Sequence, residues 1–417
     1  MPSVSSLKSL NRQERSWDTE HKDELLARAE AHIFSTGLRD GATHLCRANM
    51  KYGLAKIHWV QEQLGTKSDT TFISTPDMTI TRNVARWKSG FGYGGKVTWG
   101  DGDIELVILD VKPNTCGMLV GGIERLPDSS ELVRMVDKLK GGKREIDGIE
   151  VQWDFHLSNH FIDLFWVKPL GEVKFSEYVF IIHSSARELT GDNRIGFGLY
   201  YDKSPLLRNM AERFNTPFGP LHILTGSRAR EYYQFYRFAE EYSKQKRNIA
   251  AEALFGEFKL IANEVHQGLA NMNEILLGCH QFDEKEPDCV FPFVLRADLP
   301  AYLVKGKPNL EENDIESLGF RQRSQRLGVY DRLKKANIIP HGSGYAFPDL
   351  LNVSRVFEHN AHRYFEVDLL NDRGKKVLSD VREIPYIYRG REVVLKTLEL
   401  NMCELVAKLL PQYVLKI

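Results

Sequence analysis

The chain has 417 residues, of which 42% are hydrophobic and 27% are charged, a composition typical of globular proteins with one large domain or two ordinary ones. Lys and Arg total 56, as do Asp and Glu, so the net charge neither indicates nor excludes a protein that binds nucleic acid. No apolar run approaches the about 20 residues that a membrane-spanning helix needs, so we expect no membrane partner.

Cysteine usage and the first residues favour the cytoplasm. The five cysteines are odd in number and widely spaced, which argues against a disulfide framework. Residues 1–25 are polar and lack the apolar core of a signal peptide. We therefore expect a cytoplasmic protein with reduced thiols.

Residues 1–70 have a helical pattern. Residues 18–31 combine early acidic residues with good helix formers, and residues 52–64 form a second candidate helix. We expect this segment to pack at the periphery of a catalytic domain that spans residues 71–417. We found no internal repeat, linker or low-complexity stretch within that domain.

The first chemically suggestive residues follow a predicted strand over residues 103–110, which is rich in β-branched and apolar residues. Asp110 ends this strand, and Cys116 lies between it and the next apolar run. A carboxylate and a thiol at the end of a buried strand suit a metal ion. The alternative for Cys116 is a small buried hydrophobic residue, which is the commonest role of a free cysteine.

Two further strand ends carry histidines. After a helix over residues 130–139, a strand–loop–strand pattern contains Asn159 and His160, and the very apolar run 178–183 ends on His183. Loops at strand ends carry function more often than the middles of strands do. These positions are therefore candidates for ligands.

Residues 186–226 lack a clear period and are interpreted as a long excursion. Residues 227–276 predict one long helical region, whose aromatic residues would face the core. Its basic residues Lys244, Lys246 and Arg247 could contact phosphates, although such a cluster more often forms a solvated face. His280 follows the end of this predicted helix.

The last third combines a strand over 289–296, charged helices over 305–335, and a Gly/Ser turn over 338–344. Backbone N–H groups in such a turn can meet an anion, which makes Ser343 a candidate. A helix over 391–410 and a strand over 413–417 are predicted to end the chain and to place Lys416 within the fold.

A short loop between these elements contains His359, His362 and Arg363. Histidine can attack phosphorus, and arginine holds phosphate oxygens with its planar guanidinium group. This loop therefore suits phosphate chemistry. The alternative is an ordinary surface loop rich in histidine.

One thiolate and three imidazoles, from Cys116, His160, His183 and His280, suit Zn, Mn, Co or Fe, and Asp110 would shift the preference toward Mn. A thiolate shared by two ions could build a two-metal site for phosphoryl transfer. The ligands are scattered rather than paired in a known spacing, so the spacing alone is weak evidence.

The order of these motifs resembles that of the RtcB family of RNA ligases, from about residue 75 to the C-terminus. The matching stretches are Thr75-Pro-Asp77-Met, Asp110…Cys116-Gly-Met, Ser158-Asn159-His160-Phe-Ile-Asp163, His183-Ser-Ser-Ala-Arg187, Cys279-His280-Gln, Ile338-Ile-Pro-His-Gly-Ser343-Gly, His359-Asn-Ala-His-Arg363, Ile387-Tyr388-Arg and Val414-Leu-Lys416-Ile.

The resemblance implies an α+β fold, with one large RtcB-like domain whose sheets and helices surround a metal and nucleotide cleft. It implies an enzyme that joins RNA 3′-phosphate or 2′,3′-cyclic phosphate ends to 5′-hydroxyl ends, using GTP and one or two Mn²⁺ ions, with Zn²⁺ as an alternative. Its partners would be the ends of tRNA or other cleaved RNA.

The resemblance also implies a role for each matching residue. His359 would be the nucleophile that carries GMP, assisted by Arg363. The nucleotide would contact Asn159, Asp163, Ser343, Tyr388 and Lys416, and the metal ligands would be Asp110, Cys116, His160, His183 and His280.

The chain departs from the family pattern at several of these motifs. Pro113 stands where the family has a metal-binding Asp, and Asn360 and His362 replace two glycines of the nucleophile loop. These departures leave two alternatives open: another metal-dependent phosphoryl or nucleotidyl chemistry, or a protein that binds RNA ends without catalysis.

Overall fold

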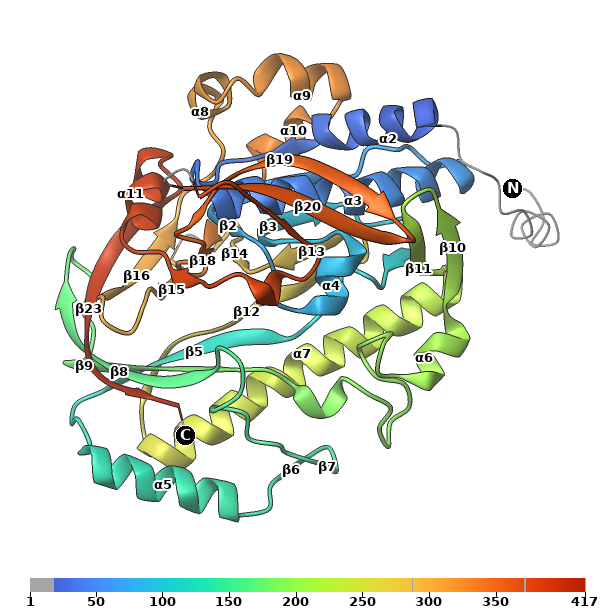
Figure 1. Ribbon diagram of the computed structural model, residues 1–417. Helices are drawn as coiled ribbons and strands as arrows, with labels where there is room; N and C mark the ends of the chain where they lie inside the picture. Colours follow the sequence, from blue (N-terminus) through green and yellow to red (C-terminus); the bar gives the residue numbers. More distant parts are fainter. Residues whose placement is uncertain (1–18, 287, 371–372, 417) are drawn as a thin grey trace.

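The computed structural model describes residues 19–286, 288–370 and 373–416. It is a mixed α/β structure built on an eleven-stranded sheet (Figure 1). Its paired strands are antiparallel except for β1 and β2. In spatial order the strands are β1 (Ile33–Phe34), β2 (Thr71–Thr79), β3 (Tyr93–Thr98), β13 (Glu274–Leu277), β12 (Lys259–Asn271), β5 (Cys116–Ile123), β9 (Tyr178–Ser184), β8 (Phe161–Pro169), β23 (Cys403–Leu415), β16 (Ala301–Gly306) and β15 (Val290–Phe293).

Small sheets and helices surround this main sheet. The small sheets are β10 (Glu212–Thr216), β11 (Gly219–Thr225) and β4 (Leu106–Ile108); β14 (Cys279–Gln281) and β17 (Ile338–Pro340); β18 (Tyr345–Ala346) and β22 (Ile387–Tyr388); β19 (Leu350–His359), β20 (His362–Leu369) and β21 (Lys375–Leu378); and β6 (Glu145–Ile146) and β7 (Ile149–Glu150). The α-helices are α2 (Thr19–Ala31), α3 (Gly41–Gln63), α4 (Val84–Ser89), α5 (Ser129–Gly141), α6 (Pro205–Met210), α7 (Gly226–Phe255), α8 (Glu312–Ser317), α9 (Arg321–Leu327), α10 (Tyr330–Lys334) and α11 (Glu392–Glu399).

The centre of the main sheet is buried on both faces. Strand β9 alternates between two apolar clusters: Phe180 and Ile182 pack with residues of α5 and α7, whereas Val179 and Ile181 pack with residues of β16 and β23. A strand covered on both sides reads as a continuous apolar run, which is why β9 is recognisable in the sequence. In Figure 1, α5 and α7 lie on the lower side of the sheet, and α2 and α3 lie on the upper side.

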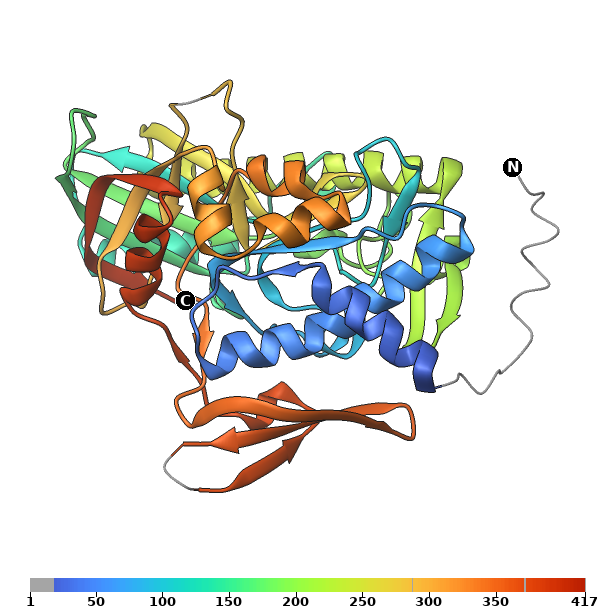
Figure 2. The same ribbon diagram turned by 90° about the horizontal axis from the view of Figure 1, so that it is seen from above.

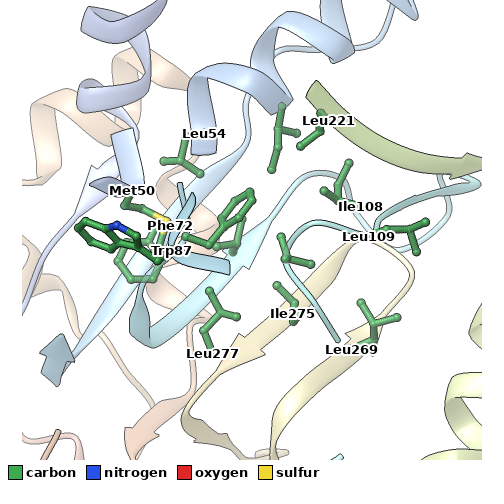
Figure 3. Close-up of a cluster of buried hydrophobic side chains, with 14 of the residues drawn as sticks. Met50, Leu54, Phe72, Trp87, Ile108, Leu109, Leu221, Leu269, Ile275 and Leu277 are labelled. Atoms are coloured by element: carbon green, nitrogen blue, oxygen red, sulfur yellow. The ribbon is translucent and has the colours of Figure 1, made fainter. Parts of the chain in front are cut away.

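The largest apolar cluster joins α3 to the strands at one end of the sheet. Figure 3 shows Met50 and Leu54 of α3 beside Phe72 of β2, Trp87 of α4 and Ile275 of β13. Burying each side chain of this kind stabilises the folded state by about 1.5–3 kcal/mol relative to leaving it exposed. Helix α3 is thus central, and the prediction that it is peripheral was wrong.

The two predicted helices over residues 18–31 and 52–64 exist, and the second begins earlier, at Gly41. Asp18 and the residues before it lie outside the described part of the chain. Strand β1 joins the main sheet by pairing with β2. The expected boundary between residues 70 and 71 therefore separates two hydrogen-bonded strands of one sheet.

The predicted helix over residues 227–276 ends 21 residues early. Helix α7 stops at Phe255, and Gly256 adopts φ 65°, a left-handed conformation that glycine tolerates. The following residues form β12 and β13 of the main sheet. The aromatic residues of the true helical part are buried as predicted, among them Tyr232, Tyr236 and Tyr242.

The predicted helix over residues 391–410 is also too long. Helix α11 ends at Glu399, Asn401 adopts φ 49°, and β23 continues from Cys403 to Leu415 between β8 and β16. The terminal strand thus begins ten residues before the predicted one. Among the described residues, no helix has the length and apolarity that crossing a membrane would require.

The segment around His359 is a β-hairpin rather than an irregular loop. His359 ends β19 and pairs with His362, the first residue of β20. Asn360 and Ala361 form the two-residue turn with φ values of 50° and 60°, as the tight turns that match strand twist require. In Figure 2, β19, β20 and β21 form a separate layer along the lower edge of the molecule.

Candidate functional site

Four neighbouring strands near the middle of the main sheet, β12, β5, β9 and β8, bring cysteine and histidine side chains together. Cys116 is the first residue of β5 and pairs with Gln267 of β12, next to His266. In β9, His183 pairs with Met118 of β5 and with Phe161, the first residue of β8. Because these strands are antiparallel, the start of β5, the end of β9 and the start of β8 meet at the same place.

The sulfur of Cys116 is the centre of this cluster. It lies 2.9 Å from Nε2 of His183 and 3.4 Å from Nε2 of His160. Ligand atoms of Cys116, His183 and His266 all lie within 4.8 Å of one another, and all three residues are buried. One thiolate and two imidazoles at this spacing could hold a metal ion.

Two features of the histidines fit a metal ion at this place. His183 donates its Nδ1 proton to the carbonyl oxygen of Asn159 at 3.1 Å, which leaves Nε2 as a free lone pair toward the sulfur. Both ring nitrogens of His266 are buried without a hydrogen-bond partner among the described residues. A buried polar group without a partner is costly, and a bound cation would remove that cost at one nitrogen.

Burial keeps the inner histidines neutral, as metal ligation requires. It lowers the pKa of His266 well below the usual value, and the neighbouring His341 and His183 lower it further. Burial and the neighbouring His160 likewise lower the pKa of His183. For His160, burial opposes protonation, but the charges of Cys116 and Asp154 outweigh it and raise the pKa to about 10.

A buried ionic network lies behind the cluster. Oδ2 of Asp154 lies 2.9 Å from Nδ1 of His160, and its Oδ1 lies 3.4 Å from Nζ of Lys246. Lys246 and Arg247 are both fully buried. For Lys246 and Arg247, both the phosphate contact and the solvated face that the sequence suggested are therefore wrong, whereas Lys244 is partly exposed and pairs with Glu264 at 2.9 Å.

The residue after Cys116 must be glycine, because a side chain there would collide with this network. A Cβ atom on Gly117 would lie 2.4 Å from the carbonyl oxygen of Glu264 and 2.9 Å from the guanidinium group of Arg247. Arg247 in turn donates to Asn263 at 2.7 Å. The guanidinium group therefore packs directly against the strand that begins with Cys116.

A second polar pair adjoins the cluster. His341 follows β17, and its Nδ1 donates to Oδ2 of Asp77 at 3.0 Å. Asp77 is fully buried, and its other oxygen accepts a hydrogen bond from Thr75 at 2.6 Å. The ring of His341 lies 4.7 Å from that of His266, centre to centre. With Nδ1 committed to Asp77, Nε2 of His341 carries the free lone pair.

Cys116, His160, His183 and His341 line a cavity of about 680 Å³, whose wall does not include His266 or Asp77. Eight predicted site residues line it: Cys116, Asn159, His160, Asp163, His183, Ser343, Tyr388 and Lys416. The prediction that Lys416 lies within the fold is confirmed, since its Nζ donates to the carbonyl oxygen of Ser158 at 2.6 Å.

The charge of the cavity wall is strongly positive. Six cationic side chains line it: Arg82, Arg86, Arg187, Lys203, Arg296 and Lys416. Its acidic residues are Asp154, which is paired with His160 and Lys246, and Asp163. Burial raises the pKa of Asp163 to about 8 against the opposing charge of Lys416. A phosphate-bearing ligand would thus meet mainly positive charge.

The structure places neither Asp110 nor His280 among the three clustered ligands, although the ring of His280 lies 5.6 Å from that of His266, centre to centre. Both carboxylate oxygens of Asp110 face His222, and one accepts its backbone N–H at 2.6 Å. His280 donates from Nε2 to the carbonyl oxygen of Pro292 at 3.0 Å, in the separate β14–β17 sheet. As metal ligands, these two predictions lack geometric support.

The predicted nucleophile His359 and its partner Arg363 also lie away from the cavity wall. His359 is exposed at the hairpin turn. Arg363 is turned toward the body of the protein, where its guanidinium group lies 3.7 Å from the ring centre of Tyr52 and donates to Asn49. Arg363 of the hairpin therefore makes a cation–π contact inside the protein and is not placed to hold a phosphate in the cavity.

The sequence analysis missed His266, the residue that completes the cluster. The residue lies in the stretch that was assigned to a long helix, where no side chain would face Cys116. The signal that could have corrected this was Gly256, since a glycine near the end of a helical pattern often ends the helix. The dipeptide His-Gln also occurs at both 266 and 280, so the motif alone could not choose between them.

Comparisons with known proteins leave the family of this chain open. The sequence matches no protein-family model and no curated protein at a significant level.

Metal content tests this cluster. Replacing Cys116 or His266 with alanine is expected to weaken metal binding at least about 100-fold, because each removes a ligand. The matched control is His280→Gln, whose amide can still donate to Pro292 and which should leave the metal content unchanged. Elemental analysis of the purified variants measures the effect. Full metal content in His266→Ala would remove this residue from the site.

Proposed function

We propose that this chain is a metal-dependent nucleotidyl-transfer enzyme acting on RNA ends, an RNA ligase of the RtcB type, in which His341 carries the nucleotide. The observation that carries the proposal is that His341, which is paired with Asp77 and lies beside His266, lines the same cation-lined cavity as Cys116 and His183. The order of motifs in the sequence supplies the choice of RNA ends.

The proposed first step forms a phosphorus–nitrogen bond. Nε2 of His341 attacks the α-phosphorus of a nucleoside triphosphate, preferably GTP, and pyrophosphate leaves with the electron pair of the broken P–O bond. The Nδ1 proton of His341 remains on the bond to Asp77 throughout. A carboxylate in this role holds the imidazole in the reactive tautomer and stabilises the positive charge that develops on it.

The cationic wall stabilises the phosphates during this step. Arg187 and Lys416 line the cavity together with His341, Cys116 and His183. Fixed guanidinium and ammonium groups stabilise charge on transferring phosphoryl oxygens at no reorganisation cost. A metal ion held by Cys116, His183 and His266 would neutralise further phosphate charge, and Mn²⁺ or Zn²⁺ are the candidates for this donor set.

A second candidate is a hydrolase that cleaves phosphoesters at one metal ion. The specific observation in its favour is the donor set, because three protein ligands with an open position are typical of catalytic zinc sites. Under this alternative, His341 and Asp77 would act as a general base toward water, and no nucleotide would become attached to the protein.

Nucleotide labelling separates the two candidates. Purified protein loaded with Mn²⁺ is incubated with each α-labelled nucleoside triphosphate and run on a denaturing gel. The ligase proposal predicts a labelled protein band with GTP, stable to denaturation because the phosphorus–nitrogen bond is covalent. The absence of a band with all four nucleotides, in protein whose metal content is verified, would overturn it and favour the hydrolase.

A further inference from the structure

An exposed aromatic patch lies at the rim of the cavity, outside the residues that the proposed chemistry uses. Tyr386 is 39% exposed and Ile387 is 49% exposed. The ring of Tyr386 packs edge-on against Tyr345 at 4.9 Å and Tyr388 at 5.9 Å, centre to centre. Tyr345 and Tyr388 line the cavity, whereas Tyr386 continues the patch outward.

A guanidinium group lies against the same ring. The central carbon of Arg82 is 4.2 Å from the ring centre of Tyr386. Arg82 lines the cavity, and its Nη1 has no hydrogen-bond partner among the described residues. This nitrogen is buried, so the aromatic ring and not a hydrogen bond of Nη1 holds the guanidinium group in place.

The backbone holds this patch in a fixed position. Tyr345 pairs with Tyr388 in the two-stranded β18–β22 sheet. Arg389, the residue after Tyr388, is fully buried and donates to the carbonyl oxygens of Asp77 and Met78. The aromatic rings are thus tied to the same strand that positions Asp77, and the patch is pre-organised.

We propose that Arg82 and Tyr386 form a binding site for single-stranded RNA, which stacks a base on Tyr386 as the strand leaves the cavity. Bases of unpaired RNA stack on exposed aromatic side chains and on guanidinium planes. The cationic wall beside the patch, which includes Arg82, complements the RNA backbone. This inference rests on the proposed function for the choice of RNA and for the direction of the strand.

Equilibrium binding tests the site without any nucleotide or catalysis. The affinity of the full chain for a short fluorescein-labelled single-stranded RNA is measured by fluorescence anisotropy. Tyr386→Leu, which keeps an apolar side chain but removes the stacking surface, is expected to weaken binding at least about tenfold, and Arg82→Ala similarly. Tyr386→Phe should remain within about twofold of the unmodified protein.

Two controls keep the result specific. Leu395→Ala removes an apolar side chain of α11 that is 66% exposed, more than Tyr386, and should leave the affinity unchanged. A duplex of the same sequence, whose bases are already stacked, should bind more weakly than the single strand.

The outcomes separate this inference from the proposed function. Selective loss of RNA affinity in Tyr386→Leu supports the site even if no nucleotide labelling occurs. Unchanged RNA affinity in both Tyr386→Leu and Arg82→Ala overturns it, even if labelling with GTP succeeds, and would leave the patch as a surface for a protein. Equal affinity for duplex and single strand would also overturn it.

Discussion

Replacing His341 with alanine is expected to abolish covalent labelling of the protein by a nucleotide while leaving its metal content unchanged. The reason is that Nε2 of His341 is the proposed attacking atom, whereas the metal ligands are Cys116, His183 and His266. The measurement is the labelled band on a denaturing gel together with elemental analysis of the same preparation. His359→Ala, at the exposed hairpin turn, is the matched control and should label normally.

Asp77→Asn sharpens this test. The asparagine amide would donate to Nδ1 of His341, so the ring proton would move to Nε2 and block the attacking lone pair. Loss of this orienting carboxylate is expected to slow labelling by up to about 10⁴-fold. The ring of Tyr93 packs edge-on against that of His341, 5.2 Å away centre to centre, and this contact does not depend on Asp77.

The opposite pattern would reassign these residues. If His341→Ala loses its metal, then His341 is a ligand, and the nucleophile must be sought elsewhere. If His359→Ala loses labelling while His341→Ala retains it, the assignment that the family resemblance implied would be restored, and the hairpin would have to move toward the cavity.

Replacing Arg389 with alanine is expected to lower the free energy of unfolding by about 3 kcal/mol, because it removes a fully buried guanidinium group both from its pair with the partly exposed Asp40 and from two backbone carbonyl oxygens. Arg389 is fully buried, and its Nε and Nη2 donate to the two oxygens of Asp40 at 2.7 and 2.9 Å. The same side chain donates to the carbonyl oxygens of Asp77 and Met78. One guanidinium group thus joins the start of α3, strand β2 and the segment after β22.

Denaturant unfolding followed by circular dichroism measures this loss. Arg125→Ala is the matched control, because the Arg125–Glu131 pair is equally well formed but its arginine side chain is 71% exposed. That variant should change the free energy of unfolding by less than about 1 kcal/mol. Arg389→Lys should fall between the two, since an ammonium group cannot make the paired contact with Asp40. If Arg389→Ala lowers the free energy of unfolding by less than about 1 kcal/mol, Arg389 does not hold these three segments together.

Hydrophobic and helix-forming patterns over short stretches of the sequence predicted several helices and strands correctly. The apolar run that becomes β9, the helix that becomes α5 and the start of β5 at Cys116 were all recognisable. The same patterns located Cys116, His160 and His183, because each lies at the end of a strand. The structure brings these three residues together.

The wrong predictions, two helices that are too long and a loop at His359, each have a physical cause. The segments after Gly256 and Asn401 contain apolar residues that fit a helical period, and only their pairing in the centre of the sheet makes them strands. His359 lies next to an Asn-Ala turn, which lacks the glycine that usually marks a tight hairpin. It therefore resembled a loop that could close over a ligand.

The sequence by itself determined the mixed α/β class, the apolar centre of the sheet and the residue types from which a metal site can be built. Only the tertiary structure decided which of these residues meet. His266 replaces His280 beside Cys116 because the antiparallel register sets β12 against β5, and His341 lies beside them because Asp77 of β2 binds its ring. Such contacts depend on strand pairing between residues far apart in the chain, and the spacing of motifs along a sequence does not encode that pairing.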